Sequence, residues 1–132
     1  MGKGKGEMRE LNDYWATVGA EVIKAQKSLH HITERELKIA YLISDKNKTS
    51  GGKTVYADCA KVSDKDKWAV NYDFLITVYP AGQALDDEQA HILMHHELLH
   101  IHPTADKTRG HDIDEFMEIA DKYGLHWAED AL

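Results

Sequence analysis

Apolar residues recur at helical spacing near the start of the chain. A helix is predicted here, ending at about residue 29. Its apolar side consists of Trp15, Val18, Val22 and Ile23. Asn12 or Asp13 can cap its start, because a short polar side chain accepts a hydrogen bond from the first helical turn. Residues 1–10, with alternating glycine and lysine, are expected to form a flexible tail.

Strand patterns follow in the middle of the chain. The clearest lies at residues 72–79, where every second residue is apolar or aromatic. These alternating positions are Tyr72, Phe74, Ile76 and Val78. Residues 38–44 and 54–62 are also predicted to be strands. Residues 45–53, which join them, are polar and contain Gly51 and Gly52, so we expect a hairpin loop or a mobile flap.

Two further helices are predicted in the last third of the chain. The first spans residues 86–102, with Asp86 as N-cap, Gln89 completing a capping box and Pro103 as the stop. Its core-facing stripe consists of Ala90, Met94, Leu98 and Ile101. The second begins near Asp112 and ends at Gly124. Helices combined with a few strands predict the α+β class.

The segment His96-Glu97-Leu98-Leu99-His100 has the pattern of a catalytic zinc site. Residues four apart on a helix share one face, so His96 and His100 can both bind one Zn²⁺. Glu97 is placed to take a proton from a water molecule on the ion. This pattern predicts metal-assisted amide hydrolysis, although two ordinary histidines on an amphipathic helix would give the same spacing.

A catalytic zinc site needs a third protein ligand, and the residues after the helix supply candidates. His111 follows a polar loop that contains a proline and a glycine, and it is the first choice as ligand. Glu115 lies one helical turn further on and can hydrogen-bond to a ligating imidazole. Asp112 and Glu115 also have capping-box spacing, so both can instead serve the helix start. Direct ligation by Glu115 or Asp112 is the remaining alternative.

The other histidines of the motif helix are expected to be solvated. His91, His95 and His102 form a stripe well away from His96 on a helical wheel, which keeps them from joining the same ion. Cys59 lies in a strand-like segment and is expected to be a packing or surface thiol.

Composition limits the class of protein. With 132 residues, 42% of them apolar, the chain can form one domain without disulfides, and we assign residues 11–132 to it. The single cysteine and the lack of an 18-residue apolar run lead us to expect a cytosolic protein that does not insert into membranes. The formal net charge of −7 disfavours binding to nucleic acid.

Several segments together resemble the putative phage metallopeptidase family, small zincin-like proteins similar to SprT-like metalloproteases. These segments are residues 50–57, 73–78, 95–101 and 111–116. The resemblance implies a minimal zincin-like domain, in which a small mixed sheet carries an active-site helix and flanking helices. It implies His96, His100 and His111 as zinc ligands and Glu97 as the catalytic acid and base. It also implies that one strand of the sheet binds an extended polypeptide substrate.

The resulting hypothesis is a phage- or prophage-encoded zinc metallopeptidase that acts in the cytoplasm of the bacterial host. Two alternatives remain at this stage. One is an inactive zincin-like phage protein that binds a host protein and uses zinc for structure. The other is a hydrolase acting on a non-peptide amide. Glu97 separates the enzymes from the binder, because a structural zinc site does not need that carboxylate.

Overall fold

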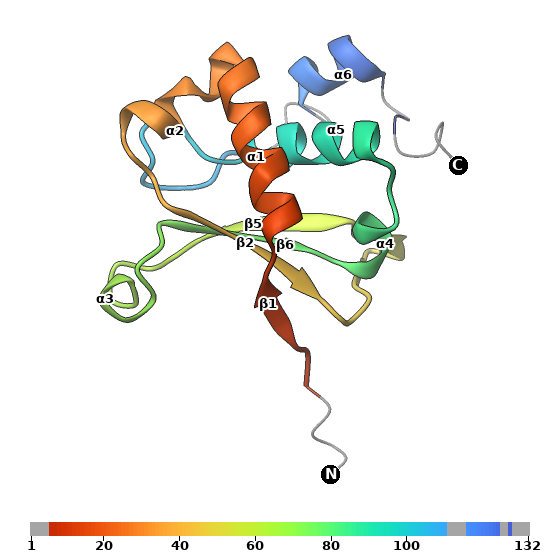
Figure 1. Cartoon of the computed structure of the whole chain (residues 1–132), viewed down its shortest axis with the longest axis horizontal. Helices are drawn as coiled ribbons and strands as arrows, with labels where there is room; N and C mark the ends of the chain where they lie inside the picture. Colours follow the sequence, from red (N-terminus) through yellow and green to blue (C-terminus); the bar gives the residue numbers. More distant parts are fainter. Residues whose placement is uncertain (1–5, 111–115, 125–126, 128–132) are drawn as a thin grey trace.

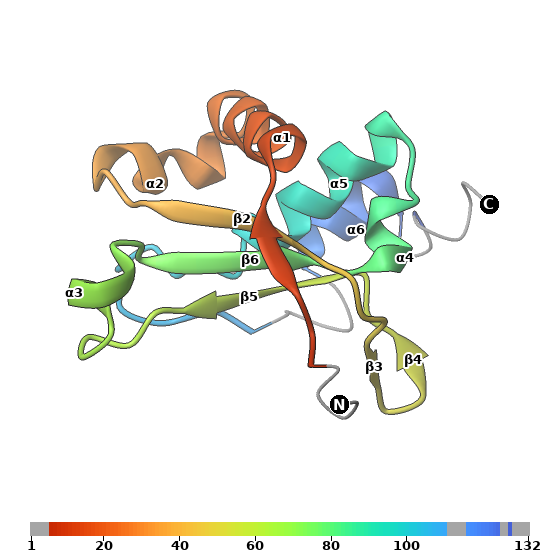
Figure 2. The ribbon, with the colours of Figure 1, turned by 60° about the horizontal axis from the view of Figure 1, so that its bottom comes forward.

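The computed structural model describes residues 6–110, 116–124 and 127. It has the α+β architecture predicted from the sequence, with helices packed on one side of a small mixed sheet (Figures 1 and 2). The helices are α1 (Asp13–Ala25), the 3-10 helix η1 (Lys27–Leu29), α2 (His30–Glu34), α3 (Lys67–Val70), α4 (Pro80–Gln83), α5 (Asp87–Leu98) and α6 (Met117–Tyr123). The strands are β1 (Arg9–Leu11), β2 (Ile39–Ser44), β3 (Thr49–Ser50), β4 (Lys53–Thr54), β5 (Ala57–Lys61) and β6 (Phe74–Val78).

The main sheet has four strands in the order β1-β2-β6-β5. Strands β2 and β6 run parallel, whereas β1 and β5 are antiparallel to their neighbours. Arg9 and Glu10, which the sequence assigned to a tail, are therefore part of the sheet, because they pair with Ser44 and Ile43. Strand β6 is central, and β1 and β5 are the edges of the described sheet.

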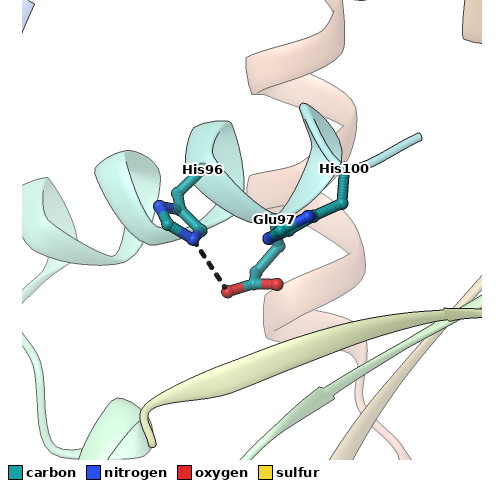
Figure 3. A group of neighbouring side chains, drawn as sticks. All are labelled: His96, Glu97 and His100. Atoms are coloured by element: carbon teal, nitrogen blue, oxygen red, sulfur yellow. Dashed lines mark ion pairs between the residues drawn. The ribbon is translucent and has the colours of Figure 1, made fainter. Parts of the chain in front are cut away.

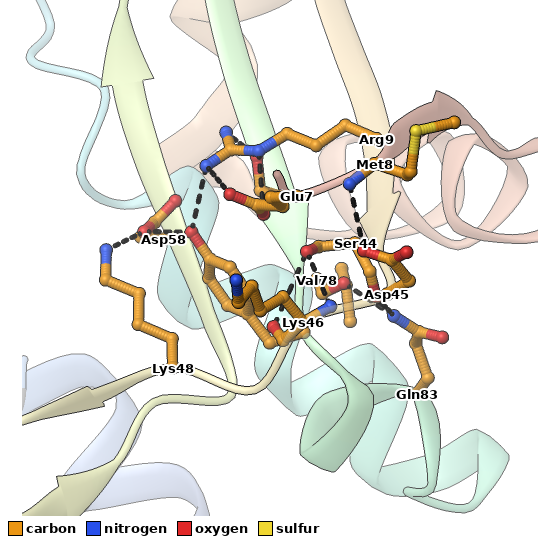
Figure 4. Close-up of polar contacts among 12 residues, drawn as sticks. Glu7, Met8, Arg9, Ser44, Asp45, Lys46, Lys48, Asp58, Val78 and Gln83 are labelled. Atoms are coloured by element: carbon orange, nitrogen blue, oxygen red, sulfur yellow. Dashed lines mark hydrogen bonds and ion pairs between the residues drawn. The ribbon is translucent and has the colours of Figure 1, made fainter. Parts of the chain in front are cut away.

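A polar cluster ties β1 and the neighbouring hairpin to the sheet (Figure 4). The Arg9 guanidinium donates to Thr77 Oγ1 at 3.0 Å. On the adjoining strand, Asp58 accepts hydrogen bonds from the Tyr79 hydroxyl at 2.8 Å and from Lys48 Nζ at 2.6 Å. Because Thr77 alternates with the core residues of β6, this cluster lies on the sheet face opposite the helices.

The core lies between the sheet and the helices. Phe74, Ile76 and Val78 of β6 are completely buried and face the helices. Helix α1 approaches the sheet closely at Gly19, where a Cβ atom would lie 2.4 Å from the ring of Tyr41. Only glycine allows this approach, which brings the apolar side of α1 onto β2.

Helix α1 begins as the sequence predicts and ends earlier. The Asn12 side chain accepts a hydrogen bond from the Trp15 amide at 2.9 Å, so Asn12 is the N-cap. The helix ends at Ala25, not near residue 29, because Gln26 adopts an extended conformation. Helices η1 and α2 then continue the chain, and His30 and His31 form the first turn of α2.

The segment between β2 and β5 forms a separate two-stranded hairpin. Strands β3 and β4 pair antiparallel, and the turn consists of Gly51 and Gly52 with φ values of 58° and 79°. Positive φ is costly for other residues, so the two glycines explain the turn. The hairpin projects away from the helices (Figure 2).

Helix α5 has the predicted start and a different end. Both hydrogen bonds of the capping box between Asp86 and Gln89 are present, at 2.8 and 3.0 Å. The predicted stripe is buried, with Ala90, Met94, Leu98 and Ile101 at most 1% exposed. However, the α-helix ends at Leu98 and not at residue 102. The chain tightens into a turn, with His100 N donating to the Glu97 carbonyl at 3.1 Å, and Ile101 then pairs with Thr108.

Within the described residues, no helix combines the length and the apolar character that crossing a membrane requires.

Candidate metal centre

His96, Glu97 and His100 lie together at the C-terminal end of α5 (Figure 3). Each offers a potential ligand atom, and these atoms lie within 4.8 Å of one another. The two imidazole rings have their centroids 5.3 Å apart. His100 lies in the turn after the α-helix, yet its ring remains beside that of His96. The tightened turn therefore keeps the two nitrogens close enough to bind one ion.

Glu97 is almost completely buried, with 3% of its surface exposed. Its Oε2 atom lies 3.8 Å from His96 Nε2. Strand β5 packs against α5. Burial raises the pKa of the Cys59 thiol on β5, and the negative charge of Glu97 raises that pKa further. Figure 3 shows the Glu97 side chain directed towards this edge strand, and Cys59 itself packs against the core.

The imidazole of His100 is oriented by the loop that follows it. His100 Nδ1 lies 2.7 Å from the carbonyl oxygen of Arg109, which can only accept a hydrogen bond. Nδ1 therefore carries the proton, and Nε2 presents its lone pair to the centre. Ligating histidines are commonly held in this way, so the donor set fits a metal ion that prefers nitrogen ligands.

Phe116 forms a wall of the site that the sequence analysis did not identify. Its side chain is completely buried, and its ring centroid lies 5.5 Å from that of His96 and 4.9 Å from that of His100. The Arg109 guanidinium lies 4.6 Å from the centroid of the Phe116 ring. Phe116 lies within the segment predicted to form the last helix, but no local signal places it against the two imidazoles.

The prediction that His95 is solvated is wrong. His95 has no exposed surface, because α6 packs against its side of α5. Its Nδ1 lies 3.1 Å from the Tyr123 hydroxyl, and its Nε2 contacts the Glu118 carboxylate. The Tyr123 hydroxyl is therefore a hydrogen-bond partner of His95.

The other two histidines of that predicted stripe have separate partners. His91 Nε2 contacts the Glu21 carboxylate at 2.8 Å, and its Nδ1 contacts the Asp87 carbonyl at 2.7 Å. His102 accepts a hydrogen bond from the Thr104 amide at 3.1 Å.

The predicted third ligand falls in a part of the chain that is not described. His111, Asp112 and Glu115 all lie outside the described residues. The choice between His111 and Glu115 therefore stays a prediction. Phe116, the first residue described after this gap, contacts both imidazoles.

Comparison with known proteins supports one family assignment. No curated protein and no solved structure matches the chain. A family model described as "Putative phage metallopeptidase" matches residues 9–131, nearly the whole chain, and the protein belongs to this family.

Proposed function

We propose that the protein is a zinc metallopeptidase in which His96 and His100 hold the ion and Glu97 is the general base. The observation that carries the proposal is the close grouping of these three side chains, with His100 oriented by a backbone carbonyl. Family membership supports a peptidase and implies a metal ion. The two imidazoles favour zinc over calcium or magnesium, which prefer oxygen ligands.

Glu97 has the surroundings that a general base needs. Its carboxylate is buried, close to His96, and beside an edge strand where a substrate can lie. When bound, zinc lowers the pKa of a coordinated water and polarises the substrate carbonyl. Glu97 would accept the proton of the attacking water and return it to the leaving amine.

Strand β5 is the proposed substrate strand. It pairs with β6 on one side, and in the described sheet its other edge is open. An extended peptide can add to such an edge by main-chain hydrogen bonds, which would hold the scissile bond beside α5. Strand β6, the clearest strand in the sequence, cannot serve because both of its edges are paired. The net charge of −7 favours neutral or basic polypeptides over nucleic acid.

The remaining parts of the proposal rest on the sequence. His111 would complete the zinc site, with Glu115 as its hydrogen-bond partner. Residues 11–132 would form the catalytic domain. The phage-associated family and the single cysteine favour action in the bacterial cytoplasm.

The test combines metal content with activity. Purified wild-type protein should contain about one zinc per chain, measured by elemental analysis. Replacing His96 or His100 by alanine should remove the zinc, whereas His102→Ala, a matched histidine control, should retain it. Glu97→Gln should keep the zinc and lower the hydrolysis of an unfolded polypeptide by about 10²-fold or more.

Each alternative has its own outcome. Wild-type protein that is folded and takes up no zinc would contradict the proposal. Zinc binding without cleavage by wild type or Glu97→Gln would favour the binding protein. Cleavage at equal rates by both would exclude Glu97 as the base.

A further inference from the structure

We infer that the contact between His95 and Glu118 positions the metal centre, because it fixes the start of α6 and therefore the ring of Phe116. The inference rests on the proposed function, since it takes His96 and His100 as the metal ligands. His95 and Glu118 would act as positioning residues through Phe116.

The imidazole of His95 is buried, and both of its ring nitrogens have partners. A neutral His95 can donate from Nε2 to the Glu118 carboxylate and accept at Nδ1 from the Tyr123 hydroxyl, 3.1 Å away. The same carboxylate accepts a hydrogen bond from Ser28 Oγ at 2.7 Å. Burial alone would raise the pKa of Glu118, but the hydrogen bonds from Ser28 and His95 outweigh it and hold the pKa below its usual value. Glu118 therefore connects α6 to both α5 and η1.

Both residues of the contact are close in sequence to residues of the metal centre. His95 directly precedes His96 on α5, and Glu118 lies in the first turn of α6, two residues after Phe116. The Phe116 carbonyl accepts hydrogen bonds from the amides of Ile119 and Ala120, both at 3.0 Å, so it is rigidly joined to that first turn. A displacement of Glu118 would therefore displace Phe116.

Phe116 transmits such a displacement to the ligands. Its buried ring contacts both imidazoles, with centroid distances of 5.5 and 4.9 Å. The core is closely packed, so a moved ring leaves a gap or a clash beside His96 and His100. Metal binding is sensitive to this, because ligand distances must hold to within about 0.2 Å.

If Glu118 only stabilised α6, any change that loosens this helix would disturb the metal centre equally. A second residue of α6 provides the control for this possibility. Lys122, on the same helix, donates to the Gln26 side chain at 2.8 Å. This hydrogen bond connects α6 to the residue before η1 and not to α5. If any loosening of α6 disturbed the site, Lys122→Met would have the same effect as a change at Glu118.

The experiment measures Co²⁺ affinity, the Co²⁺ absorption spectrum, and the imidazole proton signals of His96 and His100 in metal-free protein. Glu118→Ala should weaken Co²⁺ binding about 10-fold, the lower end of effects seen for groups behind metal ligands. It should also shift the imidazole signals, because the ring current of Phe116 changes. Glu118→Asp keeps the charge but shortens the side chain, and it should change both readouts in the same direction. Glu118→Gln can keep the contact and should restore values close to wild type.

The outcomes separate this inference from the proposed function. Unchanged affinity and unchanged imidazole signals in Glu118→Ala would overturn it, as would equal effects of Lys122→Met. If Glu118→Ala does not fold, Glu118→Asp carries the same test. If wild-type protein binds no Co²⁺, the proposed function fails, and the imidazole signals of metal-free variants still decide whether Glu118 positions Phe116.

Discussion

His100 Nδ1 lies 2.7 Å from the carbonyl oxygen of Arg109, and this contact joins the candidate metal centre to the loop that precedes the predicted third ligand in the sequence. The loop is closed by the pairing of Ile101 with Thr108, which is a contact between protein groups alone. A preformed ligand orientation reduces the cost of binding, because less freedom is lost when the ion arrives.

This contact predicts the tautomer of His100. Neutral His100 should carry its proton on Nδ1, whereas neutral His102, whose Nδ1 accepts from the Thr104 amide, should carry it on Nε2. Nitrogen-15 NMR of metal-free protein at alkaline pH distinguishes the two forms. A proton on Nε2 of His100 would show that the carbonyl does not orient the ring.

The side chain of Met94 should contribute strongly to stability. It is completely buried between α5 and the core, so Met94→Ala should lower the free energy of unfolding by about 2–5 kcal/mol. Met8 is 70% exposed, and Met8→Ala should change the same quantity by less than about 0.5 kcal/mol. Chemical denaturation of both variants provides the comparison. Equal effects would contradict the packing described for α5.

The start of α5 can be predicted from sequence because its determinants are local. Asp86 and Gln89 are three residues apart, and each bonds to the backbone of the other. The end of α5 cannot be predicted from local residues. It depends on contacts with residues beyond the turn, including the bond between the His102 amide and the Lys107 carbonyl. Pro103 is a local stop signal, but these contacts end the helix before the chain reaches it.

The difference between local and distant determinants also explains which histidine positions could be predicted from the sequence. The four-residue spacing of His96 and His100 is local, and the structure keeps them together. His91 and His95 also look equivalent on a helical wheel, yet His95 is buried because α6 covers it. Helix α6 is distant in sequence, and no pattern within α5 reveals where it docks. The central position of β6 in the sheet cannot be predicted from the sequence for the same reason, since strand pairing joins residues far apart in the chain.

His91 should make stability depend on pH. Its hydrogen bonds to the Asp87 carbonyl and to Glu21 raise its pKa above the usual 6.5, although burial opposes them. A raised pKa in the folded state means that protonation stabilises the fold below pH 6.5, and this contribution is lost as pH rises through the folded pKa.

The measurement compares wild type with His91→Gln under metal-free conditions. The difference in unfolding free energy should be larger at about pH 5.5 than at about pH 8.5. A difference that stays constant, or grows with pH, would show that His91 is not preferentially protonated in the folded protein.

The last prediction concerns the third zinc ligand. If His111 binds the ion and Glu115 hydrogen-bonds to it, His111→Ala should remove most of the zinc affinity, whereas Glu115→Ala should cost about 10–100-fold. Isothermal titration of each variant with zinc gives the ranking, and the opposite ranking would make Glu115 the ligand. Helix α6 has Phe116 as its N-cap, so thermal melts at saturating zinc serve to show that each variant remains folded. Asp112→Ala tests the remaining alternative, because a loss of zinc affinity in this variant alone would make Asp112 the ligand.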